Sequence, residues 1–462
     1  MTKDMTQGRA LPLILKFMVP LLLGNLFQQT YNIVDAAVVG RILGSNALAA
    51  VGASSSVQFL VLGFCMGTCC GFAIPIAQRF GAKDYEGMKS YVFHSCILTA
   101  ALAVILTVIC TLACTAIMNA LSTPEEIFAD AYTYQFIIFS GIPCTLLYNL
   151  MANFLRAVGN SRVPFIFLAV STCVNIVLDL FFIVVLGWGV SGAAIATITA
   201  QGMSGILCLI YIIRRVPVLH PAEKNRRFGI VYFRDLIVMG VPMGLQYSIT
   251  AIGSMVMQSA NNSLGTVYVT AFTAASRIKQ FALCPIDALS TAVATFCSQN
   301  LGAKQMDRVK RGLKDGVITG VLYGVFAGLI LIFAGRGLCL IFVSNDAASV
   351  LDAASRYLRC MGYCFWILGV LCVVRQAVQG IGYAGRAVFA GVVEMIARCC
   401  VSIFLVPLFG FGAICWSDQS AWFTATVYIV ITGIFCMKKA ESKIRGEESG
   451  IKEQNSEGRI RN

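Results

Sequence analysis

Apolar runs follow one another along almost the whole chain, with short polar segments between them. A run of about 20 such residues crosses the hydrocarbon core of a bilayer as an α-helix. Twelve runs can be counted, near residues 13–39, 47–76, 92–118, 131–154, 164–186, 190–213, 235–259, 268–297, 315–343, 354–378, 387–407 and 416–437. The pattern therefore predicts an all-α membrane protein with twelve transmembrane helices.

The second half of the pattern repeats the first half about 221 residues later. The pair Leu43-Gly44 recurs as Leu264-Gly265, and the segment 78–83 recurs as 299–304. This unit is far longer than the roughly 20–50 residues of a solenoid repeat. Six spans in each half place the halves parallel in the membrane, related by an axis along its normal. We expect two pseudo-symmetric six-helix lobes.

Composition and charge narrow the class of protein. The chain has 462 residues, of which 58% are hydrophobic and 12% charged, whereas a soluble domain has about 25% charged residues. The net charge of +13 comes from Lys and Arg in short patches between the apolar runs. No patch alternates with aromatic residues as a nucleic-acid surface does. A soluble enzyme and a nucleic-acid-binding protein are therefore both disfavoured.

The basic patches also predict the topology, because cytoplasmic loops are enriched in Lys and Arg. They fall in the segments 79–89, 156–162, 214–227, 304–314, 386 and 438 onward, whereas the loop 119–130 carries three acids and no base. Both termini are therefore expected in the cytoplasm. We divide the chain into an N-lobe (1–213), a cytoplasmic linker (214–230), a C-lobe (231–437) and a cytoplasmic tail (438–462), the tail being expected to lack regular structure from Glu441.

A few acidic residues lie within apolar spans, where a charge is costly and marks a candidate functional site. In the first span, Gln28, Tyr31 and Asp35 share one helix face because they are three and four residues apart. In the fifth span, Asn175 and Asp179 also share a face. Two carboxyl groups with polar neighbours suit a site that takes up a proton or a cation, because apolar surroundings favour the neutral form of an acid.

Thr197 of the sixth span and Asn153 at the end of the fourth could complete a polar chamber in the N-lobe. The alternative is that Asn175 and Asp179 only form hydrogen bonds between helices.

The C-lobe offers secondary candidates. Glu394 and Arg398 are four residues apart and can pair on one helix face. Asp287 follows Pro285, and either Arg277 or Lys279 could neutralise it. Each of these groups could serve function or only balance charge.

Another base, Arg375, lies near the end of its span and is expected to reach the cytoplasmic surface.

Metal and cofactor chemistry finds little support in the sequence. The 19 cysteines lie mostly inside apolar runs, where a thiol acts as a small hydrophobe. The chain has two histidines, His94 and His220, and no CxxC pair, so zinc ligation is poorly supported. We expect no cofactor, and no metal other than Na⁺ at Asp35 and Asp179.

These residues resemble the multidrug and toxic compound extrusion (MATE) family of antiporters over about residues 10–437. The resemblance rests on Val19-Pro20 and Val241-Pro242, on the paired Leu-Gly motifs, on the paired segments 78–83 and 299–304, and on the glycine-rich segments 156–161, 187–192 and 379–382.

The resemblance implies two six-helix lobes that form a V, and export of small organic cations or amphipathic drugs in exchange for external H⁺ or Na⁺. It implies a coupling group in the N-lobe, which matches Gln28, Tyr31, Asp35, Asn153, Asn175, Asp179 and Thr197. Other members carry acids in the seventh and tenth helices, where this chain offers glutamine or no carboxylate. We expect a monomer in the plasma membrane that works by alternating access.

Other functions remain open from the sequence. A flippase for lipid-linked glycans or similar lipids would suit the same fold, and a strongly cationic cavity would favour it. A major-facilitator protein also has twelve spans, but the loop at 79–84 lacks its motif. An intramembrane enzyme would need a nucleophile and base, or metal ligands, at membrane depth, and the sequence offers neither.

Overall fold

The structure of the chain is a computed structural model that describes residues 3–121, 123–343 and 347–460, and their side chains except at 45, 54 and 447–460. Within these ranges every regular element is a helix. Eleven helices are long and apolar enough to cross a membrane, and two shorter ones, bent by 44°, can form a twelfth span. The predicted all-α membrane fold is confirmed.

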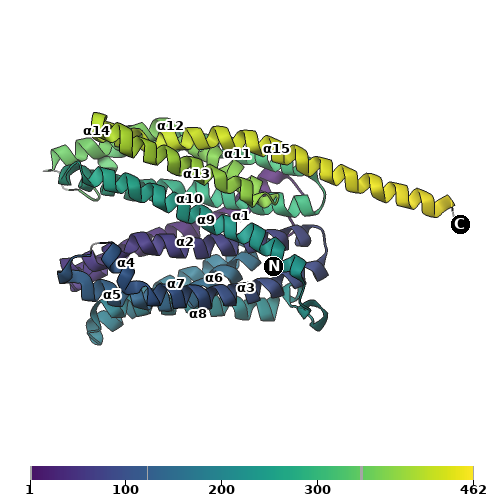
Figure 1. Cartoon of the computed structure of the whole chain (residues 1–462), viewed down its shortest axis with the longest axis horizontal. Coiled ribbons are helices and arrows are strands. Elements are labelled where there is room, and N and C mark those ends of the chain that lie inside the picture. The colour runs from purple at the N-terminus through teal and green to yellow at the C-terminus, as the bar shows by residue number, and fades with distance from the viewer. Residues whose placement is uncertain (1–2, 122, 344–346, 461–462) are drawn as a thin grey trace.

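The helices form two lobes that lie side by side and approach each other most closely toward the end that carries the N-terminus (Figure 1). The first lobe contains α1 (Ala10–Ile42), α2 (Ser45–Gly81), α3 (Tyr85–Leu112), α4 (Cys114–Ala120), α5 (Glu125–Ser140), α6 (Ile142–Ala157), α7 (Arg162–Leu180) and α8 (Gly189–Arg215). The second contains α9 (Ile230–Asn262), α10 (Thr266–Gly302), α11 (Met306–Cys339), α12 (Ala348–Gly380), α13 (Ala384–Cys400), α14 (Val406–Phe409) and α15 (Phe411–Ile460).

The fourth predicted span is the bent pair of α5 and α6. Pro143 has no amide hydrogen, so the carbonyl of Phe139 loses its helical partner and the helix breaks there. Gly141 sits at the break, where a Cβ would lie 2.1 Å from Cγ2 of Ile198 on α8. The bend therefore allows a close approach to α8 while one span still crosses the membrane.

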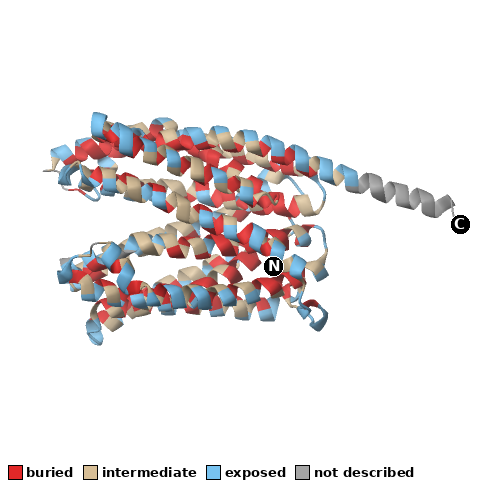
Figure 2. Ribbon diagram, viewed as in Figure 1, coloured by how far each residue is buried: buried red, intermediate tan, exposed pale blue. Residues whose placement is uncertain are grey.

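The first helix of each half packs against the opposite lobe. Ile14, Phe17 and Leu21 of α1 belong to the apolar core of the second lobe, and Leu236 of α9 belongs to the core of the first. Buried residues accordingly fill the interior of each lobe and the region where the lobes meet (Figure 2). Each lobe thus contacts the first helix of the other half.

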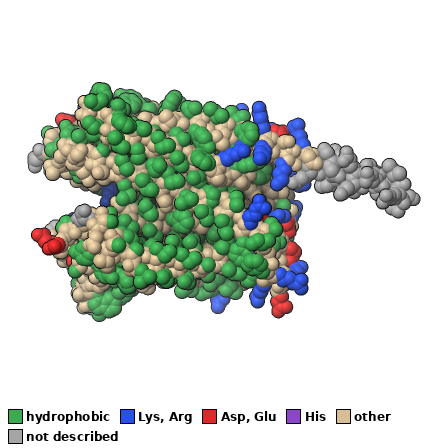
Figure 3. Space-filling model, viewed as in Figure 1, with side chains coloured by type: hydrophobic (Ala, Val, Ile, Leu, Met, Phe, Trp, Pro, Cys, Tyr) green, Lys and Arg blue, Asp and Glu red, His purple; other side chains and the backbone are tan. Residues whose placement is uncertain are grey.

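The seam between the lobes is closed over only part of its length. Along α2, Gly63, Gly67 and Gly71 lie against α9, where an added Cβ would be 3.3, 2.4 and 2.6 Å from the nearest atom. At Gly52, nearer the other end of α2, the same position is open. The space-filling surface is hollowed between the lobes at that end, and Lys and Arg gather at the opposite, closed end (Figure 3). We call the closed end the basic end.

The linker between the lobes is bound to the first lobe. It forms two short 3₁₀ turns, Pro217–Leu219 and Glu223–Arg226. Asn225 donates a hydrogen bond to the carbonyl of Glu86 at 3.1 Å, and the amide of Gly229 donates to Nε2 of His94 at 3.1 Å. His94 thus has a structural partner on the linker.

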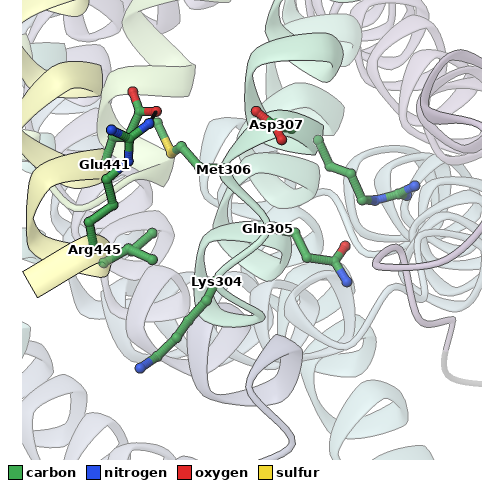
Figure 4. A pocket seen from close by; sticks show the side chains of 8 residues that line it. Lys304, Gln305, Met306, Asp307, Glu441 and Arg445 are labelled. Atoms are coloured by element: carbon green, nitrogen blue, oxygen red, sulfur yellow. Dashed lines mark hydrogen bonds and ion pairs between the residues drawn. The ribbon is translucent and has the colours of Figure 1, made fainter. Parts of the chain in front are cut away.

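The C-terminal segment differs from the prediction of an irregular tail from Glu441. The helix α15 continues to Ile460. Glu441 pairs with Lys310 of α11 at 2.8 Å and with Arg445 at 2.9 Å. Glu441 and Arg445 also border a pocket of about 340 Å³ between α15 and the start of α11 (Figure 4). These ion pairs join α15 to α11 and link successive turns of α15.

A stripe of glycines that the sequence analysis did not single out packs α11 on α12. Buried glycines recur every four residues along α11, at positions 312, 316, 320, 324 and 328. A Cβ at Gly328 would lie 2.4 Å from the carbonyl oxygen of Gly362, and a Cβ at Gly362 would lie 2.6 Å from that of Gly328. Small residues at this spacing let two transmembrane backbones touch.

We expect Gly328→Ala to destabilise the second lobe by about 1–3 kcal/mol, because the added methyl group meets backbone that cannot yield. Thermal unfolding of the detergent-solubilised protein measures the loss. Gly337→Ala on the same helix is the control, since its Cβ position is open. Equal melting temperatures for the two variants would contradict the close packing.

Candidate functional site

Two carboxyl groups meet inside the first lobe. Asp35 lies near the end of α1 and Asp179 in the last turn of α7, and the two carboxyl groups are close enough to interact electrostatically. Asp179 is buried, with 1% of its surface exposed, whereas Asp35 is partly exposed. Both acids lie within about 10 Å of the helix ends that face away from the basic end.

This pair is poorly satisfied as two ionised groups. An ionised carboxylate only accepts hydrogen bonds, and Oδ1 of Asp35 and both oxygens of Asp179 have no donor among the described residues. Two negative charges in contact repel, so such a pair favours holding one proton or one cation between them. The geometry therefore provides a site for one positive charge.

Tyrosine and threonine hydroxyl groups surround the acids. The hydroxyl of Tyr31 on α1 forms a hydrogen bond of 2.9 Å with Thr197 of α8. Tyr31 and Tyr134 of α5 both interact electrostatically with Asp35 and Asp179. Sequence analysis missed Tyr134, because no periodic pattern connects it with the acids. Four helices, α1, α5, α7 and α8, thus contribute oxygen atoms to one place.

The three predicted amide residues of the first lobe, Gln28, Asn153 and Asn175, lie in different surroundings. Asn175 lies one turn before Asp179, is buried, and has no hydrogen-bond partner on either amide atom among the described residues. Gln28 lies one turn before Tyr31 and is exposed.

Asn153 is separated from the acids. It lies four residues before the end of α6 at the basic end, where its Oδ1 is 3.7 Å from the Cys70 thiol and its amide donates to the Asn149 carbonyl at 2.8 Å. Asp179 lies 17 residues beyond Arg162, the start of α7 at the same end, which is about 25 Å along the helix. The sequence analysis grouped Asn153 with the acids as a polar residue, although its place at the end of the fourth span already put it at a different depth.

Short π-helical turns follow the buried charges in both lobes. Phe181–Val185 begins two residues after Asp179, and Val401–Leu405 begins three residues after Arg398. A π-turn interrupts the regular i to i−4 ladder and is frequent at functional sites. The two turns occupy equivalent places in the two repeats.

The second lobe holds a buried ionic network. Arg398 pairs with Glu394 at 3.4 Å, as their spacing predicts, and with Asp418 of α15 at 3.0 Å. Lys279 of α10 also binds Asp418, and the hydroxyl of Tyr357 donates to it at 2.7 Å. The network therefore connects α10, α12, α13 and α15.

Two expectations for this lobe are wrong. Arg375 does not reach the surface but pairs with Glu394 at 2.6 Å, because a buried carboxylate lies within its reach. Lys279 neutralises Asp418 rather than Asp287. Asp418 itself was missed, since its segment appeared only as a polar interruption of the last span. The available signal was an excess of bases over acids in these apolar helices, where Lys279, Arg375 and Arg398 face only Glu394 and Asp287.

Asp287 lies beside the seam between the lobes. It is exposed although it stands near the middle of α10. Its charged neighbour is Arg375, and it also interacts with Tyr247 of α9. Tyr247 packs on Gly63 and Gly67 of α2 in the opposite lobe. An acid is therefore available where a solute in the seam would contact the second lobe.

A family model named MatE matches the chain twice, over residues 20–181 and 242–404, once in each lobe. The chain belongs to the MatE family. MatE proteins are transporters rather than enzymes.

Curated MatE relatives cover most of the chain. The probable multidrug resistance protein YpnP of Bacillus subtilis is 30% identical over 381 residues, 82% of this chain and 84% of that protein. The multidrug export protein MepA of Staphylococcus haemolyticus is 23% identical over 87% of this chain and 89% of its own length. A FAD transporter of Shewanella oneidensis is 22% identical over 93% and 94%.

Solved structures show the same fold. A multidrug resistance MATE transporter in its outward-facing conformation matches with a TM-score of 0.87 at 21% identity, over 95% of this chain and 98% of that one. A MATE protein in the bent conformation matches with a TM-score of 0.88 at 20% identity, over 96% of this chain and 100% of that one. The two-lobe MatE architecture is therefore established for this chain.

Proposed function

We propose that this transporter exports organic cations and amphipathic drugs from the cell in exchange for external H⁺ or Na⁺. The proximity of Asp35 and Asp179, two acids that interact electrostatically inside the first lobe, is the observation that carries the proposal. Multidrug resistance and export proteins among the relatives support drug efflux as the transported class.

The proposed orientation places the basic end in the cytoplasm. Lys and Arg gather on that end of the molecule, and cytoplasmic loops are the ones enriched in these residues (Figure 3). The hollow between the lobes then opens to the outside of the plasma membrane. Both termini lie at the cytoplasmic side in this assignment, and one chain forms the working unit.

The acids explain how an ion could drive export. In the outward-open form an external ion reaches Asp35, which is partly exposed, and then the space between Asp35 and Asp179. Neutralising the pair removes the charge that attracts a cationic drug and changes the packing of α1 against α7. Drug and ion therefore weaken each other's binding, which is the reciprocal coupling that exchange requires.

A flippase for lipid-linked glycans is less well supported. A polyanionic cargo needs a surplus of positive charge in the cavity. In the second lobe Lys279, Arg375 and Arg398 are matched by Asp418, Glu394 and Asp287.

Everted membrane vesicles test the proposal, because their lumen corresponds to the outside of the cell. We expect a cationic dye such as ethidium to accumulate when the lumen is acidic or loaded with Na⁺, with the two gradients imposed separately. Vesicles without the protein are the control. Dye movement that persists after both gradients are collapsed would contradict ion coupling, and labelled-lipid translocation without dye transport would favour the flippase.

A further inference from the structure

The two lobes touch at the basic end through a pair of equivalent glycines. A Cβ at Gly81, the last residue of α2, would lie 1.9 Å from the carbonyl oxygen of Gln299. A Cβ at Gly302, the last residue of α10, would lie 1.8 Å from the carbonyl oxygen of Gln78. The two backbones therefore meet without side chains between them, in the segments that the sequence repeats.

Each of the two glutamines reaches across the seam to the opposite lobe. Gln78 donates from Nε2 to the carbonyl of Gly380 at 3.1 Å, and Gln299 donates to the carbonyl of Ala157 at 2.8 Å. Gly380 ends α12 and Ala157 ends α6, and the last carbonyls of a helix have no partner within it. Each lobe thus caps a helix of the other lobe.

The segment before α1 crosses the same seam. The amide of Lys3 donates to the carbonyl of Val158 in the first lobe at 3.0 Å. The amide of Met5 donates to Oε1 of Gln299 at 2.9 Å, and the carbonyl of Met5 accepts from Arg308 at 3.0 Å, both in the second lobe. The side chain of Met5 is fully buried. The N-terminal segment therefore binds both lobes at once.

We propose that Gln78, Gly81, Gln299, Gly302 and residues 3–8, together called the clasp, form the gate that holds the basic end shut. The proposal rests on alternating access as the proposed function. The clasp closes when the lobes open to the outside and must separate before they can open to the other side. Bonds made in one state and lost in the other set the balance between the two states.

Replacement of one glutamine by leucine, a side chain of similar size, tests the gate while largely retaining the packing. Gln299→Leu removes the bonds to Ala157 and to Met5, and Gln305→Leu is the control, since Gln305 is exposed in the following loop. We expect hydrogen exchange at the amides of Lys3 and Met5 to rise by about three- to tenfold per bond lost. Exchange should fall at the same time in the outer halves of α2 and α10, as the hollow closes.

The symmetric variant separates the two arms of the clasp. Gln78→Leu removes the bond across the seam to the Gly380 carbonyl, which still accepts from Ser298 of its own lobe at 2.9 Å, and should shift the outer halves in the same direction. The bond from Met5 to Gln299 remains. Gly81→Ala should give the largest shift, because its methyl group forbids closure, and Gly385→Ala at an open position is its control.

If hydrogen exchange rises at the basic end but does not change in the outer halves, the gate is overturned, and the clasp is only a structural contact. Unchanged exchange at both ends in Gln299→Leu would overturn it as well. The readout does not depend on cargo. Suppose wild-type vesicles fail to move dye, while in the clasp variants hydrogen exchange still rises at the basic end and falls in the outer halves. The gate then stands and the proposed function fails.

Discussion

Replacement of Asp179 by asparagine is expected to uncouple transport from the ion gradient. Asparagine has nearly the same volume as aspartate but carries no charge, so it resembles the neutralised acid permanently. The pair with Asp35 can then no longer gain and lose a cation during the cycle. We expect gradient-driven dye efflux to be largely lost, together with the ion-dependent change in drug affinity, which is about 5- to 150-fold for a typical coupling free energy.

Drug binding should give the matching equilibrium result. In the wild type, drug affinity should change with pH or Na⁺ concentration, whereas in Asp179→Asn it should be weak and independent of both. Asp307→Asn is the control, because Asp307 is an exposed carboxylate in the first turn of α11. Full efflux in both Asp35→Asn and Asp179→Asn would rule out this pair as the coupling site.

Replacement of Asp418 by asparagine is expected to cost stability rather than coupling. Asp418 is 1% exposed and binds Lys279, Arg398 and Tyr357. Without its charge, two bases remain inside the lobe with one acid fewer to balance them. Breaking such a buried arrangement costs about 3–5 kcal/mol, so the solubilised protein should unfold at a clearly lower temperature.

Two further variants separate charge balance from a general packing effect. Asp287→Asn, in the same lobe but exposed, should cost less than about 1 kcal/mol. Adding Lys279→Met to Asp418→Asn should restore part of the loss, because the unmatched base is removed with its partner. An Asp418→Asn variant that melts like the wild type but loses ion dependence would instead assign the network to transport.

The sequence predicts the fold well because its main signals are local. Apolar runs and loop charges follow from neighbouring residues, and the 221-residue repeat can be read directly by comparing the two halves. Together they predict the twelve spans and two lobes. The break at Gly141 could also be predicted from the sequence, since Pro143 interrupts the hydrogen bonds along the helix. The helix beyond Glu441 was not predicted, because this segment has no apolar pattern. The ion pairs of Glu441 with Lys310 and Arg445 involve only its first turn.

The site was predicted in part, for a physical reason. Helical periodicity assigns a residue to a face of its own helix, as it did for Tyr31 with Asp35 and for Asn175 with Asp179. It does not give depth across helices, so Asn153 was placed with an acid about 20 Å away along the axis. It also cannot connect Asp418 with Lys279, which is 139 positions away in the chain.

The clasp is self-complementary within a single chain. Gln78 of one half reaches the end of α12 in the other, and Gln299 returns the same bond to the end of α6. This reciprocity is the defining property of an isologous interface between identical subunits. A six-helix unit with one such glutamine and one such glycine would need only its own copy to complete the contact. The fused chain keeps the geometry of a homodimer at its gate, while Asp35 and Asp179 lie in one half alone.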